Sequence, residues 1–180
     1  MSDCYEEVRV SDKFRFKLYQ DEDSNTPEDW DNEDVYLRID EDHLRNGLGR
    51  CWDISMFNDA VQHPEEFHTF PVFRGESPQE RVFLSFVGGF LEQGSDTRQG
   101  YVYVRKNVWN CLEDALKAAQ AHLDEWNMYL NGDVWGFEIL EDTTCKCCGN
   151  TTTEVVDSLW GIYGFDYARN QARDACTTYT

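Results

Sequence analysis

Apolar and polar residues alternate in two segments near the start of the chain. In residues 8–20 the larger apolar side chains fall on one face, and in residues 34–40 Tyr36 and Arg38 fall opposite three aliphatic residues. Alternation with a period of two is typical of a β-strand that buries one face. Both segments are therefore predicted strands, and Tyr36 and Arg38 are predicted to point outward from the second.

A longer segment, residues 111–130, has a different period. Its apolar residues recur at steps of three and four, which places them on one face of an α-helix. They are Leu112, Ala115, Leu116, Ala119, Leu123, Trp126 and Leu130. Asn131 and Gly132 follow, a pair that commonly ends a helix in the left-handed conformation. The pattern predicts an amphipathic helix at about residues 111–130, with this face toward a core.

The remaining patterns complete the predicted order of elements. Strands are expected over residues 81–90, 100–107, 133–142 and 153–164, a short helix from about 53 to 63, extended chain over 68–75, and a C-terminal helix over 165–176. From residue 82 the order is strand, strand, helix, strand, strand, helix. This order predicts an α+β fold in which both helices pack on one face of an antiparallel sheet. No linker-like composition occurs, so residues 1–180 are predicted to form a single domain, with an acidic part at 1–78 and a core at 79–180.

The charge of the chain narrows the possible functions. Among 180 residues there are 35 Asp and Glu against 16 Lys and Arg, which gives a formal net charge of -19. A field of this sign repels nucleic acid and anionic membranes, and it attracts basic proteins and metal ions. Direct binding of nucleic acid or membrane is therefore not expected, whereas a basic protein partner is. The same charge also fits a protein from a salt-rich cell, which is an alternative explanation.

The acidic residues are concentrated between residues 20 and 43, where eleven of them accompany a single basic residue, Arg38. Carboxylates on alternate residues of a strand lie about 6.8 Å apart, close to the phosphate spacing along one strand of DNA. Two aromatic residues in the segment are typical of interface anchors. The predicted partner-binding residues are Asp21, Glu22, Asp23, Glu28, Asp29, Trp30, Asp31, Glu33, Asp34, Tyr36, Asp40, Glu41 and Asp42. The alternative is a solvated loop without a binding role.

The cysteines suggest a second candidate site. Seven cysteines at irregular spacing do not fit the disulfide framework of a small secreted protein. No signal-peptide pattern and no long apolar run occur, so a cytoplasmic chain with mostly reduced thiols is expected. Cys145, Cys147 and Cys148 form a cluster. Zinc sites usually combine two Cys pairs, so zinc here would need a fourth ligand from Cys176, Cys111 or a histidine. The alternatives are exposed reduced thiols without metal and a disulfide or redox role. No other cofactor is expected.

Sequence motifs of the common enzyme classes do not occur. There is no phosphate-binding glycine loop, no nucleophile elbow and no dinucleotide fingerprint, and the four histidines are scattered without metal-binding spacing. The chain is therefore not expected to be an enzyme. Trp135, Phe137, Trp160 and Tyr163 lie on adjacent predicted strands, where aromatic pairs beside glycine commonly build a core. Burial is expected for these four residues.

The C-terminal half carries three motifs in a fixed order. They are a Gly-aromatic strand at 100–104, the segment "YLNGDVWGF" at 129–137 and the segment "DSLWGIYG" at 157–164. In this order they resemble a family of small uncharacterised proteins encoded by bacteriophages and other mobile elements, which supplies no catalytic residues to carry over. The chain departs from that family at Leu159, where Cys is usual, and in the inserted "CKCCGN".

This resemblance implies a protein made inside a bacterial cell by a phage or mobile element. Together with the acidic segment, it favours an inhibitor of a host defence system, anti-CRISPR or antirestriction, which acts as a DNA mimic on a basic nucleic-acid-binding protein in the host cytoplasm. The alternative is a small zinc-binding or accessory phage protein with Cys145, Cys147 and Cys148 as ligands.

Overall fold

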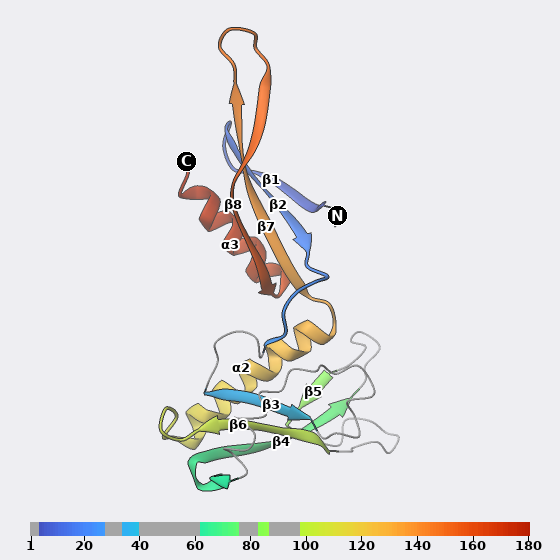
Figure 1. The fold of residues 1–180 in the computed structure, drawn as a ribbon, viewed down its shortest axis with the longest axis vertical. Coiled ribbons are helices and arrows are strands. Elements are labelled where there is room, and N and C mark those ends of the chain that lie inside the picture. Colours follow the sequence, from blue (N-terminus) through green and yellow to red (C-terminus); the bar gives the residue numbers. More distant parts are fainter. Residues whose placement is uncertain (1–3, 28–33, 40–61, 76–82, 87–97) are drawn as a thin grey trace. The chain divides into compact units, whose positions relative to one another are not determined.

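The chain forms two compact units in the computed structural model (Figure 1). The structure describes residues 4–27, 34–39, 62–75, 83–86 and 98–180. Unit 1 comprises Met1–Ser24 and Gly132–Thr180, and unit 2 comprises Asn25–Asn131. Unit 2 is thus inserted between the two segments of unit 1. This division differs from the single domain predicted for residues 1–180, in which the acidic part ends at residue 78 and the core begins at residue 79.

Unit 1 is a four-stranded antiparallel sheet with one helix (Figure 1). Its strand order is β1-β2-β7-β8. The elements are β1 (Cys4–Arg9), β2 (Phe14–Gln20), β7 (Val134–Thr144), β8 (Thr151–Tyr163) and α3 (Phe165–Thr177). Strand β2 pairs with β7 along its whole length. Two segments that unit 2 separates in the sequence therefore lie side by side in one sheet.

The alternation along β2 and β7 decides which face of this sheet is buried. Phe16 and Leu18 of β2 lie opposite Ile139 and Phe137 of β7, and all four are at most 2% exposed. Helix α3 covers this face with small residues spaced four apart, which are Ala168, Ala172 and Cys176. Residues spaced four apart share one side of a helix, and their small size lets α3 lie close to the sheet. The buried face predicted from Phe14, Phe16 and Leu18 is confirmed, but residues 8–20 are not one strand, because residues 10–13 separate β1 from β2.

Unit 2 repeats this plan with different segments of the chain. Its antiparallel strand order is β3-β6-β4-β5. The elements are β3 (Val35–Ile39), a 3-10 turn η3 (Pro64–Glu66), β4 (Phe67–Gly75), β5 (Phe83–Ser85), β6 (Arg98–Arg105) and α2 (Leu112–Leu130). The core joins strand residues to one face of α2 and contains Val35, Leu37, Val72, Leu84, Val102, Val104, Ala115, Ala119, Leu123 and Trp126.

Helix α2 matches the range predicted from the sequence, and most of its predicted apolar face packs on the core. Leu112 and Leu116 are the exceptions, because they are 61% and 43% exposed. Leu112 lies in the first turn, and Leu116 lies at the border of the face, about 100° around the helix from its neighbour Ala115. Gly132 follows the helix with a φ of 71°, the left-handed conformation that glycine adopts without steric cost.

The α+β class predicted from the sequence is confirmed, but the layout differs. There are two antiparallel sheets, and each helix packs on its own sheet. Local patterns specify strands and helices, whereas the choice of strand partners depends on packing between distant segments. The helix predicted near residues 53–63 falls almost wholly outside the described residues. Of the strand predicted over 81–90, the structure describes 83–86, where β5 forms.

Candidate functional sites

The loop between β7 and β8 closes a long hairpin (Figure 1). Residues 145–150, "CKCCGN", make the turn. The backbone N–H of Cys145 donates to the carbonyl oxygen of Asn150 at 2.8 Å, and the N–H of Gly149 donates to the carbonyl oxygen of Cys145 at 2.9 Å. Gly149 has a φ of 73°, which favours glycine at this position. Backbone bonds therefore define the shape of the turn.

This turn brings three thiols together. The Sγ atoms of Cys145, Cys147 and Cys148 all lie within 4.8 Å of one another, and those of Cys145 and Cys147 are 2.8 Å apart. Cys147 and Cys148 are exposed, and Cys145 is partly exposed. The position of the cluster in an exposed hairpin loop, as predicted from the sequence, is confirmed.

Local hydrogen bonds favour the thiolate form of one of these residues. The Cys145 sulfur accepts hydrogen bonds from the Cys147 thiol and from the backbone N–H groups of Cys147 and Cys148, which lowers the pKa of Cys145 to about 6. The bond to Cys145 has the opposite effect on its donor and raises the pKa of Cys147. These bonds favour the thiolate of Cys145, and thiolates are the form that binds metal ions and reacts with oxidants.

A fourth ligand for zinc does not join this cluster within the described part of the chain. Cys176, one of the three candidates named from the sequence, is fully buried in the core of unit 1 and does not join the cluster. Burial also raises the pKa of the Cys176 thiol. The cluster thus offers three sulfur ligands from one loop, whereas structural zinc is almost always four-coordinate.

Sequence reasoning missed a second group of metal-ligand residue types. His63, Glu65 and Glu66 come together at the turn η3, where the Nδ1 atom of His63 lies 3.7 Å from a carboxylate oxygen of Glu65. Pro64, which follows His63 and is the first residue of η3, is the signal that could have indicated this turn. All three residues are exposed, and exposed acidic groups of this kind are common without any bound ion.

The acidic segment divides between the two units. Asp21, Glu22 and Asp23 belong to unit 1, and Asp34 belongs to unit 2. The predicted residues that lie outside the described part of the chain are Glu28, Asp29, Trp30, Asp31, Glu33, Asp40, Glu41 and Asp42. Asp21 has a structural role, because its carboxylate accepts the backbone N–H of Gly161 at 3.0 Å. Glu22 and Asp23 are exposed to solvent.

Tyr36 does not have the exposure expected of an interface anchor. It is 6% exposed, its ring stacks on Tyr103 with centroids 5.2 Å apart, and Phe67 packs edge-on against it at 6.0 Å. The outward face of this sheet therefore carries its own small aromatic cluster. Alternation predicted the direction of the side chain, but only the neighbouring strands β4 and β6 supply the rings that bury it.

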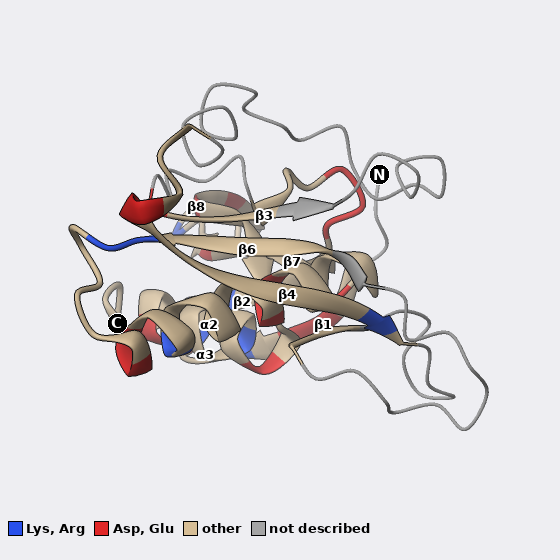
Figure 2. Cartoon of the chain, turned by 90° about the horizontal axis from the view of Figure 1, so that it is seen from below, with Lys and Arg blue, Asp and Glu red and all other residues tan. Residues whose placement is uncertain are grey.

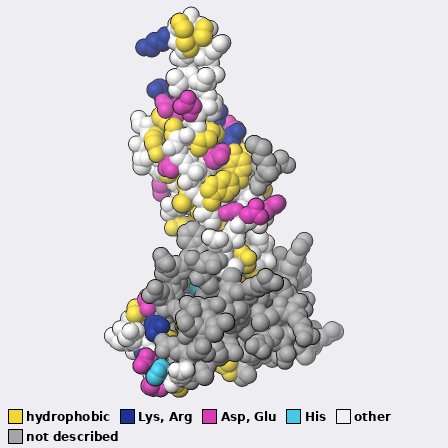
Figure 3. Space-filling model, viewed as in Figure 1, with side chains coloured by type: hydrophobic (Ala, Val, Ile, Leu, Met, Phe, Trp, Pro, Cys, Tyr) yellow, Lys and Arg dark blue, Asp and Glu magenta, His cyan; other side chains and the backbone are white. Residues whose placement is uncertain are grey.

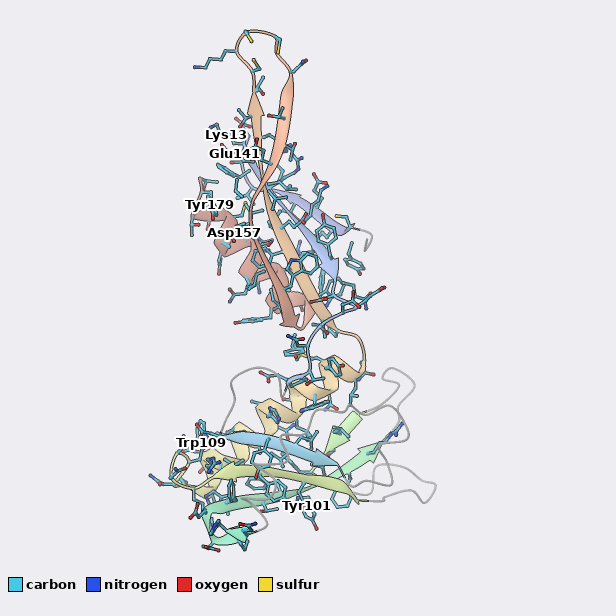
Figure 4. The ribbon with its side chains drawn as sticks, in the orientation of Figure 1. Lys13, Tyr101, Trp109, Glu141, Asp157 and Tyr179 are labelled. Atoms are coloured by element: carbon cyan, nitrogen blue, oxygen red, sulfur yellow. The ribbon has the colours of Figure 1, made fainter. Side chains whose placement is uncertain are left out.

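Most basic residues of unit 1 are held in ion pairs. The pairs are Arg9–Asp142, Arg15–Asp142, Arg15–Glu7, Lys17–Glu7, Lys13–Glu141 and Arg169–Glu6. Figure 4 shows Lys13 beside Glu141, whose charged atoms are 3.6 Å apart. In the described part of unit 1, Lys146 and Arg173 alone among Lys and Arg have no such pair. Asp142 also accepts the Thr153 hydroxyl, and this bond, together with Arg9 and Arg15, lowers the pKa of its carboxyl.

The motif residues of the C-terminal half build the frame of unit 1. The Asp133 carboxylate accepts the indole N–H of Trp135 at 2.5 Å and the backbone N–H of Phe165, the first residue of α3, at 3.1 Å. Trp160 lies directly over Gly136 and stacks on Tyr19 with centroids 5.7 Å apart. The role of Asp133 was not predicted. Its position directly before β7 was a possible signal, because an Asp can accept the free backbone N–H groups at the start of a helix.

The aromatic residues of these motifs do not share one environment. Trp135 and Phe137 are buried, as predicted, with 8% and 2% exposure. Trp160 is 40% exposed, so the prediction of a core position for it is wrong. Strand β8 is an edge strand of its sheet, and no further strand covers the outer side of Trp160 within unit 1.

Neither helix of the described residues is both long and apolar enough to cross a membrane. Comparison of the chain with family models, with curated proteins and with solved structures gives no match. The candidate sites are therefore argued from the residues alone. The main candidates are the three thiols at the hairpin tip and the acidic segment, whose sequence spans the Ser24–Asn25 boundary.

Proposed function

We propose that this protein is a phage-derived inhibitor of a host nucleic-acid-targeting defence system, which binds a basic nucleic-acid-binding protein through an acidic surface that mimics DNA. It acts as a binding protein in the host cell and not as an enzyme. The observation that carries this proposal is the net charge of -19, with eleven acidic residues concentrated in residues 20–43. The resemblance of the C-terminal half to phage proteins supports the origin.

The ion pairs of unit 1 support the proposal because they consume most of its positive charge. Five of its basic residues are bound by acids of the same unit, so they do not offset the acidic segment. Figure 2 marks the acidic and basic positions along the ribbon. Unpaired like charges raise the free energy of the isolated chain, and a cationic partner would lower it. The surplus negative charge is thus available to a partner.

Two exposed acids at the start of the segment fit this role. Glu22 and Asp23 follow strand β2 and take part in no ion pair with the described residues, whereas their neighbour Asp21 is bound to Gly161. The hydrogen bond of Asp21 fixes the start of the segment on unit 1. In this proposal Glu22, Asp23 and the acids that follow contact the partner, and Asp21 positions the chain.

A competition assay tests the proposal. Affinity capture with the purified protein from a host lysate identifies the partner, and displacement of labelled duplex DNA from that partner is then measured. The test variant carries Asp29→Asn, Asp31→Asn, Glu33→Gln and Asp34→Asn. Exposed ion pairs contribute about 0.2–1 kcal/mol each, so four losses, about 0.8–4 kcal/mol together, should weaken displacement by roughly fourfold to several hundredfold. Raising the salt concentration should weaken the native protein in the same direction.

A matched variant controls for total charge. It neutralises four exposed acids elsewhere, namely Glu113→Gln, Asp124→Asn, Glu154→Gln and Asp174→Asn, and it should displace DNA as the native protein does. If the first variant displaces DNA at full strength, the acidic segment is not the binding surface. If both variants lose the same amount, the effect is one of net charge and the mimicry proposal fails.

A second function rests on different residues. In this alternative the chain is a small metal-binding accessory protein of phage origin, and Cys145, Cys147 and Cys148 are the ligands. The proximity of the three Sγ atoms favours it, because metal ligands must converge on one point. Elemental analysis of the purified reduced protein tests it: one equivalent of zinc, lost on Cys147→Ser, is the expected result, and a metal-free protein after growth with zinc contradicts it.

A further inference from the structure

The three thiols at the β7–β8 turn are already arranged around one point. The Sγ atoms lie within 4.8 Å of one another, and the closest pair is 2.8 Å apart. Thiolates bound to one metal ion at about 2.3 Å are separated by roughly 3.8 Å around a tetrahedral centre and roughly 4.0 Å in a trigonal plane. Side-chain rotations that move the Sγ atoms by about 1 Å would therefore place all three sulfurs at bonding distance from one metal ion.

The backbone of the turn does not need to change for this. The two hydrogen bonds that close it use the N–H of Cys145 and of Gly149, and neither involves a sulfur atom. The adjoining strand ends are joined by side chains as well, since the hydroxyls of Thr144 and Thr151 lie 3.1 Å apart. A turn fixed by its own backbone presents its ligands without a large loss of conformational entropy on binding.

The number and type of ligands select the ion. Three sulfurs from one loop, with no fourth protein ligand among the described residues, leave a tetrahedral zinc site incomplete. Soft thiolate ligands favour monovalent copper, which is also satisfied by three sulfurs. Lys146 lies in the same loop and forms no ion pair with the described residues, so its positive charge can offset part of the negative charge of a metal–trithiolate group. In Figure 3 the end of the hairpin shows a group of yellow side chains, the class that includes cysteine, beside a basic side chain.

We propose that Cys145, Cys147 and Cys148 form a mononuclear three-thiolate site for a soft monovalent cation, Cu(I), at the exposed tip of the β7–β8 hairpin. Up to three thiol protons pass to solvent as the three copper–sulfur bonds form, and the oxidation state of neither copper nor sulfur changes. The exposure of the tip leaves the ion open to exchange with another thiol carrier. This site does not depend on the acidic-surface proposal, because it uses none of the same residues.

The test is a titration of the full-length reduced protein with Cu(I) in the absence of oxygen. A chromogenic Cu(I) chelator serves as the competitor, and mass spectrometry under native conditions gives the stoichiometry. One copper per monomer is expected, with X-ray absorption showing three sulfur neighbours. Removing a residue that only hydrogen-bonds to a metal ligand costs about 10–100-fold in affinity. Removing a ligand itself should cost more, so Cys147→Ser should weaken Cu(I) binding by roughly 100-fold or more. Zinc should compete poorly with Cu(I); displacement of Cu(I) by equimolar Zn²⁺ would overturn this proposal and favour the zinc-binding alternative, which uses the same three cysteines.

A matched variant separates this site from the other thiols. Cys4 and Cys111 are exposed cysteines outside the turn, and the double variant Cys4→Ser with Cys111→Ser should keep full copper affinity. Equal binding by the native protein and by the variant with all three tip cysteines changed to serine overturns the proposal. A copper cluster shared by two chains also overturns it, as does a sulfur coordination number of two or four. A fast-forming Cys145–Cys147 disulfide that persists under reductant would show a redox pair instead.

Discussion

Units 1 and 2 share a plan but differ in how the chain builds it. Among the described residues, each is a four-stranded antiparallel sheet with one helix on a face. Unit 2 uses one continuous segment, whereas unit 1 joins two segments that flank unit 2 in the sequence. The central pairing of unit 1, β2 with β7, therefore closes a loop of more than a hundred residues. The same architecture can thus be reached by nearby or by distant pairings.

Polar contacts join the two segments of unit 1. Unit 1 ties its two segments together with Asp21 on Gly161, with Arg9 and Arg15 on Asp142, and with Tyr19, whose hydroxyl donates to Glu138 at 2.9 Å. Partial burial and this bond raise the pKa of Tyr19 to about 12. Such bonds specify the register between segments that the sequence does not place together. In unit 2 the described core joins the strands to the apolar face of α2.

The largest expected effect separates the two cores. Phe16→Ala should cost unit 1 about 3–5 kcal/mol, and Leu123→Ala should cost unit 2 about 2–5 kcal/mol, because each removes a fully buried side chain. Hydrogen exchange read by mass spectrometry should show faster exchange in the mutated unit. If either mutation accelerated exchange equally in both units, the two units would unfold together and would not be separate folding units.

A smaller effect is expected at Gly136. A Cβ at this position would overlap the indole of Trp160, so Gly136→Ala should destabilise unit 1 by about 1–3 kcal/mol, as overpacking does. Urea unfolding followed by tryptophan fluorescence measures the change. The matched control is the same substitution in a Trp160→Ala background, where the cost should largely disappear. An equal cost in both backgrounds would show that Trp160 is not the cause.

The smallest effect concerns the thiol tip and should leave the fold unchanged. The Cys145 pKa is lowered to about 6 first by the Cys147 thiol, so the thiolate forms as the pH rises through that value. Cys147→Ala removes this donor and should move the pKa of Cys145 back toward the ordinary thiol value of 9.0. The rate of alkylation of Cys145 against pH, followed by peptide mass spectrometry, gives the midpoint. An unchanged midpoint would assign the shift to the backbone N–H groups and the Cys148 thiol instead.

Much of this structure could be predicted from local patterns. The helix at 111–130, the strands around 8–20 and 133–164, the C-terminal helix and the hairpin with its cysteines follow from periodicity and turn residues. The environments of Tyr36 and Trp160 could not be predicted. Tyr36 is buried because β4 and β6 bring Phe67 and Tyr103 against it. Trp160 is exposed because it lies over Gly136 and Tyr19, on the face of the sheet opposite the one that α3 covers.

The candidate sites show the same limit. Spacing alone placed Cys145, Cys147 and Cys148 in one loop, and the structure adds the distances between their sulfurs. The sequence also suggested Cys176 as a fourth ligand, which the packing of α3 excludes. For the acidic segment the sequence shows the charge, whereas the bond from Gly161 to Asp21 could be known only from the folded chain.

The sequence by itself determined the charge, the secondary-structure elements and the turn that gathers the thiols, because each depends on residues close together in the chain. The tertiary structure alone decided that the elements divide into two sheets, that residues 1–24 return to pair with residues after 131, and which aromatic residues are covered. These outcomes depend on contacts between distant segments, and no local pattern encodes which distant segment will be the partner.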